Sequence, residues 1–348
     1  MSNLKKTIVA TLMLGLLIMA GFAYFVYTNL FVPNTSFENK KAHVYISTGA
    51  NFNDVLEELS PLIKDLESFN TVANKKGYPS NIKAGHFIIN KGMNNNEIVN
   101  AIRNGNIPVI VKFNNQERIE NLAGSLANQL DADSLSFLKA MQNELFLKKY
   151  NLTKETALCN FIPNSYEVYW NVSPENFNNK MYEESNKFWN DDRIEKAKNI
   201  DLTKAQVISL AAIVQKETAK IDERAKVAGV YINRIKVGML LQADPTVIYS
   251  KKLLDNDFNQ QIKRVLYKDL KLDSPYNTYK YAGIPPGPIT MPDISSIDAV
   301  LNYEHHNYYY FVADITNFGY HNFAKNLSQH NRNKKEYVRW ISKQKVIR

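Results

Sequence analysis

The feature that most constrains this chain is an apolar run near its N-terminus, from Ile8 to Val32, preceded by Lys5 and Lys6. A helix needs about 20 apolar residues to cross the hydrocarbon core of a bilayer, and this run is long enough. The two lysines favour a cytoplasmic N-terminus. We therefore predict a cytoplasmic tail over residues 1–6 and a transmembrane anchor over 7–32. The protein is then a single-pass protein of the cytoplasmic (inner) membrane, with its bulk on the outer (periplasmic or extracytoplasmic) face.

A cleaved signal peptide is the alternative interpretation of this run. Such a peptide has a shorter apolar region, followed by a small-x-small cleavage site. Gly21-Phe22-Ala23 is a poor site, and the only cysteine, Cys159, cannot form a lipobox. The uncleaved anchor is therefore preferred. This placement also argues against nucleic acid as a partner, because chromosomal DNA and RNA lie on the other side of the membrane.

Length and charge leave several classes of protein open. A chain of 348 residues can hold two domains, or one large domain with an appendage. The formal net charge of +9 suits nucleic acid, acidic membrane surfaces or anionic polymers equally well. A single cysteine cannot form an internal disulfide or a metal cluster, so we interpret Cys159 as a small buried apolar residue, with a nucleophile as the alternative.

Residues 33–41 are polar and are predicted to be a linker, and residues 42–112 follow as a small module of mixed helix and strand. Turn and capping residues divide this module into strands around 43–46, 85–89 and 109–111, a helix after Asn51, a helical stretch around 62–73 and a helix after Asn94. The pattern resembles the LysM-like modules of glycan-binding wall proteins. On the pattern alone, an α+β module without that function fits equally well.

Residues 113–348 are predicted to form a larger mixed α/β domain. Its first part, to about residue 200, looks mostly helical, apart from a predicted turn at Phe161–Tyr166. Further on, a helix is expected from about Asp222 to Val237, and Gly238 is a suitable residue to end it. The segment Tyr308–Ala313 is predicted to be a strand, with its return partner beginning near Gly319.

The most informative segment begins at Thr203, which is a good helix N-cap. Val207 to Val214 is apolar almost all the way round a helix, which predicts a buried helix. At 100° per residue Glu217 projects near Leu210 and Ile213, so its carboxylate is expected to be partly desolvated. Desolvation raises the pKa of a carboxyl group, as a general acid working near neutral pH requires. A helix-end glutamate in a salt bridge is the alternative.

Several motifs together resemble one family, the endolytic murein transglycosylase or YceG-like family. They occur in the family's order: Ile213–Thr218, Leu241–Val247, Tyr276–Tyr279 and Gly283–Ile289, with Lys83–Phe87 and Phe161–Tyr166 earlier in the chain. Asn164 and Ser165 depart mildly from the family's Asp and Thr. The family often has a second glutamate where this chain has Gln215. The resemblance therefore assigns catalysis to Glu217.

The resemblance implies a lytic transglycosylase that cuts the β-1,4 bond between N-acetylmuramic acid and N-acetylglucosamine within peptidoglycan strands. The product ends are 1,6-anhydro sugars, and the cut ends elongation of a nascent strand. The expected substrate-binding residues, each of which has a purely structural role as its alternative, are Gln242, Asp244, Tyr276, Asn277, Tyr279, Pro286 and His321. Asp244 precedes a proline and is expected to form a turn or to position a neighbour.

The implied partners are peptidoglycan glycan strands and the cytoplasmic membrane, with peptidoglycan synthases or the division machinery as candidates. No cofactor and no metal are expected, since Glu304-His305-His306 lacks the two-residue gap of a zinc helix. Two other classes stay open. One is a membrane-anchored peptidoglycan-binding protein without chemistry. The other is a nucleic-acid-binding protein that uses the basic tail Asn331–Arg348, which otherwise forms an amphipathic helix.

Overall fold

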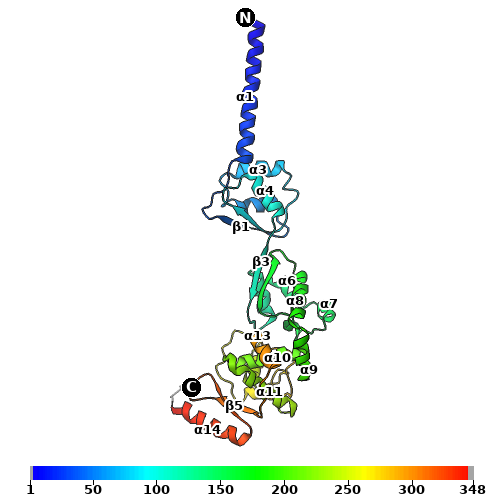
Figure 1. The fold of residues 1–348 in the computed structure, drawn as a ribbon, viewed down its shortest axis with the longest axis vertical. Helices are drawn as coiled ribbons and strands as arrows, with labels where there is room; N and C mark the ends of the chain where they lie inside the picture. Colours follow the sequence, from blue (N-terminus) through cyan, green and yellow to red (C-terminus); the bar gives the residue numbers. More distant parts are fainter. Residues whose placement is uncertain (1–2, 344–348) are drawn as a thin grey trace. The chain divides into compact units, whose positions relative to one another are not determined.

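The structure is a computed structural model that describes residues 3–343. The chain divides into two compact units. The first contains the residues up to Val111, together with Gln129–Ala132 and Tyr166–Ser173. The second contains Lys112–Asn128, Asp133–Ser165 and the residues from Pro174 onward. Figure 1 shows both units as mixtures of helices and short strands, which confirms the predicted mixed helix-and-strand composition.

The first element, α1 (Asn3–Phe31), is a single helix of 29 residues. It is long and apolar enough to cross a membrane, which agrees with the predicted anchor. Its large side chains, such as Leu12 and Phe22, are more than 60% exposed, so α1 is not the core helix of a soluble domain. At its end the carbonyl of Asn29 accepts a hydrogen bond from the side chain of Asn95.

The first unit is built on two antiparallel strands, β1 (Lys41–Ile46) and β2 (Gly85–Asn90), with Lys41 opposite Asn90 and Ile46 opposite Gly85. Three helices accompany them: α2 (Phe52–Leu59), α3 (Leu66–Lys75) and α4 (Asn95–Asn104). As predicted, Asn51 and Asn94 cap α2 and α4, and both form complete capping boxes. The apolar faces of these elements meet in one buried cluster around Phe69, Phe87 and Ile98.

Two details of this unit differ from the sequence-based expectation. The helix expected from residue 62 begins at Leu66, because Asp65 caps it. The backbone groups of Leu62 and Lys64 form hydrogen bonds outside the helix. Their partners lie in the predicted linker: Ser36 N donates to Leu62 O (2.9 Å), and Lys64 N donates to Asn34 O (3.0 Å). Asn34 is buried, so the start of the 33–41 segment packs into the unit.

Two further strands pair with each other, β3 (Pro108–Phe113) and β4 (Asn164–Tyr169). The turn predicted at Phe161–Tyr166 is therefore wrong for its second half, where β4 begins. The remaining elements up to residue 200 are helical, as expected: α5 (Ile119–Ala127), α6 (Ser134–Met141), α7 (Glu144–Lys149), η1 (Ala157–Asn160), α8 (Pro174–Phe188) and α9 (Asp191–Asn199).

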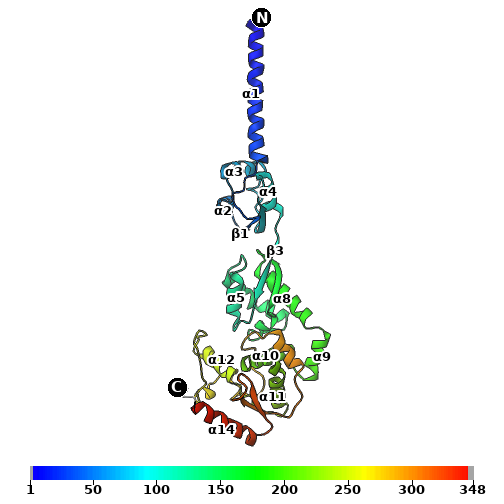
Figure 2. The ribbon, with the colours of Figure 1, turned by 60° about the vertical axis from the view of Figure 1, so that its left-hand side comes forward.

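The core of the second unit forms around α10 (Lys204–Glu217), which packs against α11 (Arg224–Lys236) and α13 (Ile294–Leu301). Thr203 caps α10 through a capping box with Gln206, and every residue from Val207 to Val214 is buried, as predicted. Figures 1 and 2 show α10 and α11 together in the middle of this unit.

Three peripheral elements complete the second unit. The strands β5 (Tyr310–Ala313) and β6 (His321–Ala324) form the predicted hairpin, with Tyr310 opposite Ala324. The helix α14 (Leu327–Lys343) packs on this hairpin, and both views show it beside β5. The motif Leu241–Val247 leads into the helix α12 (Asp244–Leu254).

Candidate active site

A cavity of about 280 Å³ opens at the C-terminal end of α10 in the second unit. Three predicted site residues besides Glu217 line it, together with aromatic and cationic side chains from α11, β5 and α14. The complete lining is Glu217, Tyr231, Arg234, Leu241, Gln242, Asp244, Tyr279, Tyr310, Phe311, Leu327 and His330. The cavity thus combines one half-buried glutamate with several polar side chains that can hydrogen-bond a ligand.

Glu217 is the last residue of α10 and enters the cavity directly after the buried run that anchors this helix. The hydroxyl of Tyr231, from α11, donates a hydrogen bond to Glu217 Oε1 at 2.7 Å. This bond fixes the carboxyl group. The other oxygen, Oε2, has no hydrogen-bond partner among residues 3–343, so it remains available to a ligand.

The environment of Glu217 is that of a general acid. Burial raises its pKa from 4.5 to about 7, and the negative charge of Asp244 acts in the same direction. The hydrogen bond from Tyr231 and the positive charges of His321 and Arg234 oppose this shift only in part. Within the described residues Glu217 forms no salt bridge, so the alternative of a paired helix-end glutamate is not what the structure shows. The carboxyl is about half protonated near neutral pH, as proton donation requires.

Gln242 reaches the cavity from a strained turn. Its φ of 51° lies in the left-handed region, which is unusual for a glutamine. Backbone bonds hold the turn: Gln242 N donates to Thr278 O (3.1 Å), and Ala243 N donates to Thr278 Oγ1 (3.0 Å). The hydroxyls of Thr246 and Thr278 lie 2.8 Å apart in the buried interior. Thr278 thus joins the 241–247 and 276–279 motifs and holds Gln242 in the lining of the cavity.

Asp244 and Tyr279 meet at the same cavity. The hydroxyl of Tyr279 donates to Asp244 Oδ1 at 2.7 Å. Tyr279 is therefore the side chain that Asp244 would position, if it has the positioning role expected from the sequence. Burial raises the pKa of Tyr279 well above its usual range, so this phenol remains a hydrogen-bond donor. Together with Gln242, these two side chains add polar groups to the lining of the cavity that holds Glu217.

The other predicted binding residues lie elsewhere in the second unit. Tyr276 is buried against Tyr249, with ring centroids 4.7 Å apart. The fully buried amide of Asn277 donates to Leu270 O and Leu272 O and so holds its own loop. Pro286 is exposed and is not among the residues lining the cavity.

His321 is held by a buried carboxylate of the second unit. Its backbone N–H donates to Glu223 Oε1 at 2.7 Å, and its Nδ1 lies 2.8 Å from Glu223 Oε2. Burial alone would raise the pKa of Glu223, but the hydrogen bonds from His321 hold that pKa below its usual value. His321 therefore influences Glu217 through its charge and does not line the cavity itself.

Seven of the lining residues were not predicted from the sequence as site residues: Tyr231, Arg234, Leu241, Tyr310, Phe311, Leu327 and His330. The sequence contains only a weak indication that Tyr231 and Arg234 belong to the site, namely their place in the helix that follows Glu217. Arg234 is buried and donates from Nε to Tyr309 O (2.6 Å) and from Nη1 to Leu241 O (2.7 Å). It therefore ties α11 to two segments of the cavity wall.

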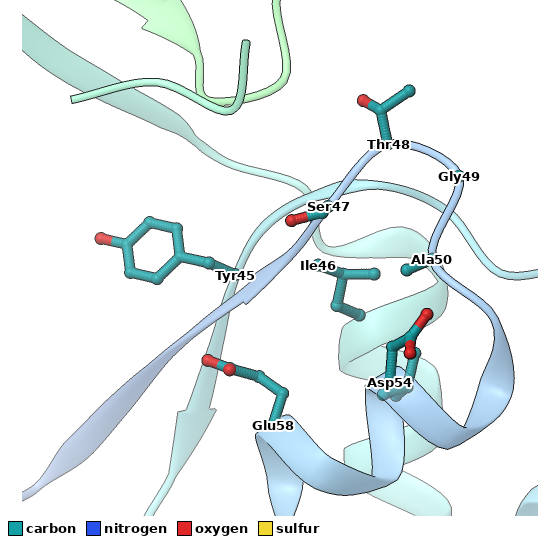
Figure 3. Close-up of a pocket in the computed structure, with 9 residues that line it drawn as sticks. Tyr45, Ile46, Ser47, Thr48, Gly49, Ala50, Asp54 and Glu58 are labelled. Carbon is teal, nitrogen blue, oxygen red and sulfur yellow. The ribbon is translucent and has the colours of Figure 1, made fainter. Parts of the chain in front are cut away.

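A second hollow, of about 350 Å³, lies in the first unit between the end of β1 and α2. Figure 3 shows the carboxylates of Asp54 and Glu58 on α2 and the hydroxyls of Ser47 and Thr48 on the preceding loop. The ring of Tyr45 borders it and stacks on His86, with centroids 4.6 Å apart. Carboxylates, hydroxyls and an aromatic ring together are groups that can bind a polar ligand.

Two other chemistries raised by the sequence are a cysteine nucleophile and a metal site. Burial raises the pKa of Cys159 to about 12, so its thiol is not a nucleophile at neutral pH. In the part of the chain that the structure describes, no three His, Cys, Asp or Glu side chains are grouped to hold a metal ion.

A half-buried glutamate with a raised pKa, in an open cavity lined by polar side chains, is an arrangement that can act on a polar ligand by general-acid chemistry. The model of the YceG-like family matches residues 44–336, and the chain belongs to this family. An endolytic murein transglycosylase of Bacillus subtilis (strain 168) is 27% identical over 337 residues, which cover 91% of each chain. One of Streptococcus pneumoniae serotype 2 (strain D39) is 26% identical over 97% of this chain and 66% of its own length. The crystal structure of a YceG-like protein of Listeria monocytogenes, 26% identical, superposes with a TM-score of 0.55 over 85% of this chain and 99% of that chain.

Proposed function

We propose that this protein is an endolytic murein transglycosylase, a lyase that cuts peptidoglycan glycan strands internally. The observation that carries the proposal is Glu217, a carboxyl whose pKa burial raises to about 7 in a cavity lined by polar side chains. Membership of the YceG-like family and the names of the similar proteins support the same activity.

The proposed reaction needs one carboxyl group. Glu217 protonates the glycosidic oxygen between N-acetylmuramic acid and N-acetylglucosamine, and the bond from that oxygen to the muramyl C1 breaks. The muramyl C6 hydroxyl attacks C1 and gives its proton to the Glu217 carboxylate. The product is a 1,6-anhydro end, the acid is regenerated and no water is consumed. Ordinary glycoside hydrolases need two carboxyls because they must manage a water or a covalent intermediate.

The remaining predicted residues have different roles in this proposal. Gln242, Asp244 and Tyr279 line the cavity and bind the sugar amides and hydroxyls. Asn277 and Tyr276 hold the loop that carries Tyr279, His321 acts on Glu217 through its charge, and Pro286 contacts the strand outside the cavity.

Analysis of the products tests the proposal against its rival, a wall-binding protein without chemistry. Long glycan strands are incubated with the purified full-length protein, and the fragments are identified by mass spectrometry. Internal cleavage with 1,6-anhydro ends is expected. Intact strands after binding would favour the rival, and reducing ends would show a hydrolase.

We further propose that α1 anchors the protein in the cytoplasmic membrane with Lys5 and Lys6 inside and both units outside. Cutting the strand there ends its elongation, with peptidoglycan synthases or the division machinery as neighbours. Protease added to intact spheroplasts is expected to degrade the protein. Survival of the full-length chain under these conditions would contradict the proposed orientation.

The module over residues 42–112 is proposed to bind glycan without catalysing its cleavage, through the hollow in Figure 3. Tyr45→Ala removes an aromatic face on which a sugar can stack and is expected to weaken retention on insoluble wall material about fivefold. Turnover of short soluble strands is expected to stay at the level of the control Tyr267→Ala, which removes an exposed tyrosine of the second unit. Equal retention of both variants would exclude the hollow as a glycan site.

A further inference from the structure

The helix α14 contributes to the catalytic cavity although it is attached lightly to the second unit. None of its residues is buried. It rests on the β5–β6 hairpin through ring contacts: His330 stacks on Tyr310 with centroids 5.2 Å apart, and Trp340 contacts Phe318 at 5.6 Å. Packing of the unit therefore does not explain why α14 carries so many cations.

A groove lies along the exposed side of α14, beyond the turn that lines the cavity. Leu327 and His330, in the first turn of the helix, line the cavity. One turn further on, Lys334 begins an open groove of about 630 Å³ whose lining is Asn331, Lys334, Lys335, Val338, Arg339 and Ser342. At 100° per residue Lys334 and Val338 share a face with Leu327 and His330, and Lys335 and Arg339 lie on the neighbouring side of the helix. The lining of the groove therefore begins one turn beyond the cavity-lining residues.

The groove is cationic and has no internal counterion. Lys334, Lys335 and Arg339 are exposed, and none forms a salt bridge with any residue between 3 and 343. Some lysines on other helices of this chain have a counterion within reach, as Lys196 does in Asp192 and Lys251 does in Asp255. The charge of Lys334 reaches the cavity, because it contributes, after burial, to the lowered pKa of His330.

We propose that this groove is the subsite for the anionic peptide substituent of the strand whose sugars occupy the cavity. The proposal rests on the proposed function. In murein the peptide is attached to the muramyl residue, the sugar whose bond is cut, and it carries free carboxylates. A carboxylate-bearing chain therefore leaves the cavity beside Glu217. From His330 to Arg339 the helix rises roughly 13 Å, which is the length of about four extended residues.

The test compares strands that carry peptides with the same strands after an amidase has removed them. The variant Lys334→Gln/Lys335→Gln/Arg339→Gln removes the groove's charge from the full-length protein. The matched control, Lys263→Gln/Arg264→Gln/Lys268→Gln, removes the same charges from an exposed loop of the second unit. Exposed ion pairs are individually weak, so the three together are expected to change KM by about tenfold at low salt.

The wild-type protein and the control variant are expected to show a KM about tenfold lower for peptide-bearing strands than for bare strands. The groove variant is expected to lose this preference at unchanged melting temperature, and the preference of wild type should fade as salt screens the charges. Equal KM values of wild type for the two substrates would overturn the proposal. So would a groove variant that keeps the preference but binds anionic lipid vesicles more weakly, since α14 would then face the membrane. Cleavage of neither substrate by wild type would instead refute the proposed function.

Discussion

Glu217→Gln is expected to lower the rate of strand cleavage by about 10²–10⁴-fold or more while the protein stays folded. Glutamine is nearly isosteric with glutamate and can still accept the hydrogen bond from Tyr231, but it cannot donate a proton to a leaving oxygen. The yield of anhydro ends per hour measures the effect. Near wild-type turnover in the folded variant would remove Glu217 from the mechanism.

The chain contains its own control for this substitution. Lys154-Glu155-Thr156 repeats the Lys-Glu-Thr sequence of the active site, but Glu155 is exposed. A hydrogen bond from Thr153 lowers the pKa of Glu155, the opposite of the shift at Glu217. Glu155→Gln is therefore expected to leave the cleavage rate and the product unchanged.

The raised pKa also fixes the sign of two pH effects. Glu217 must be protonated to act as the acid, so the cleavage rate should fall as pH rises above about 7. The folded state binds this proton more tightly than the unfolded state, so the contribution of Glu217 to stability declines between pH 4.5 and about 7. Glutamine does not ionise. At pH 8 Glu217→Gln should therefore be more stable than wild type, by up to about 3 kcal/mol.

Local chemistry made parts of this structure predictable. The helix α10 has a capping residue, Thr203, at its start and a continuous apolar run behind it, so its position, its burial and the desolvation of Glu217 all follow from one window of sequence. The caps Asn51 and Asn94 were recognisable for the same reason. The family motifs then indicated which glutamate matters, which geometry alone could not decide.

Pairing between distant segments was not predictable in this way. The strand β4 follows Pro163, and its partner β3 lies some fifty residues earlier, so nothing local distinguishes Asn164–Tyr166 from a turn. The cavity residues from β5 and α14 could not be predicted for the same reason. Tyr310 and His330 come to the cavity of Glu217 only through the packing of β5 against α11 and of α14 on the β5–β6 hairpin. A lone histidine in a basic helix has no pattern that marks it as a cavity residue.

Arg234→Met is expected to destabilise the second unit by about 3–5 kcal/mol. The guanidinium group is buried and donates to the carbonyls of Tyr309, Leu240 and Leu241. Methionine fills much of the same space but leaves these carbonyls unpaired, and an unpaired buried polar group costs roughly 1–3 kcal/mol. Chemical denaturation of the protein without α1 measures the loss in the free energy of unfolding. Arg332→Met, on the exposed side of α14, is the control and should stay within about 0.5 kcal/mol of wild type.

A third variant separates the charge of Arg234 from its hydrogen bonds. Replacing a buried charge with an apolar side chain can stabilise a protein, but only when its partners are removed as well, and here the carbonyls remain. Lysine keeps the charge but has a single ammonium group in place of the planar fork, so it cannot reach both Tyr309 and Leu241 in the same geometry. The expected order of stability is therefore wild type, then Arg234→Lys, then Arg234→Met. The two carbonyls that Arg234 holds belong to Leu241 and Tyr309, which directly precede the cavity residues Gln242 and Tyr310. The rate of strand cleavage should therefore fall in the same order, even at temperatures where all three proteins are folded. A methionine variant as stable as wild type would show that the carbonyls find other donors and that Arg234 does not hold the cavity wall.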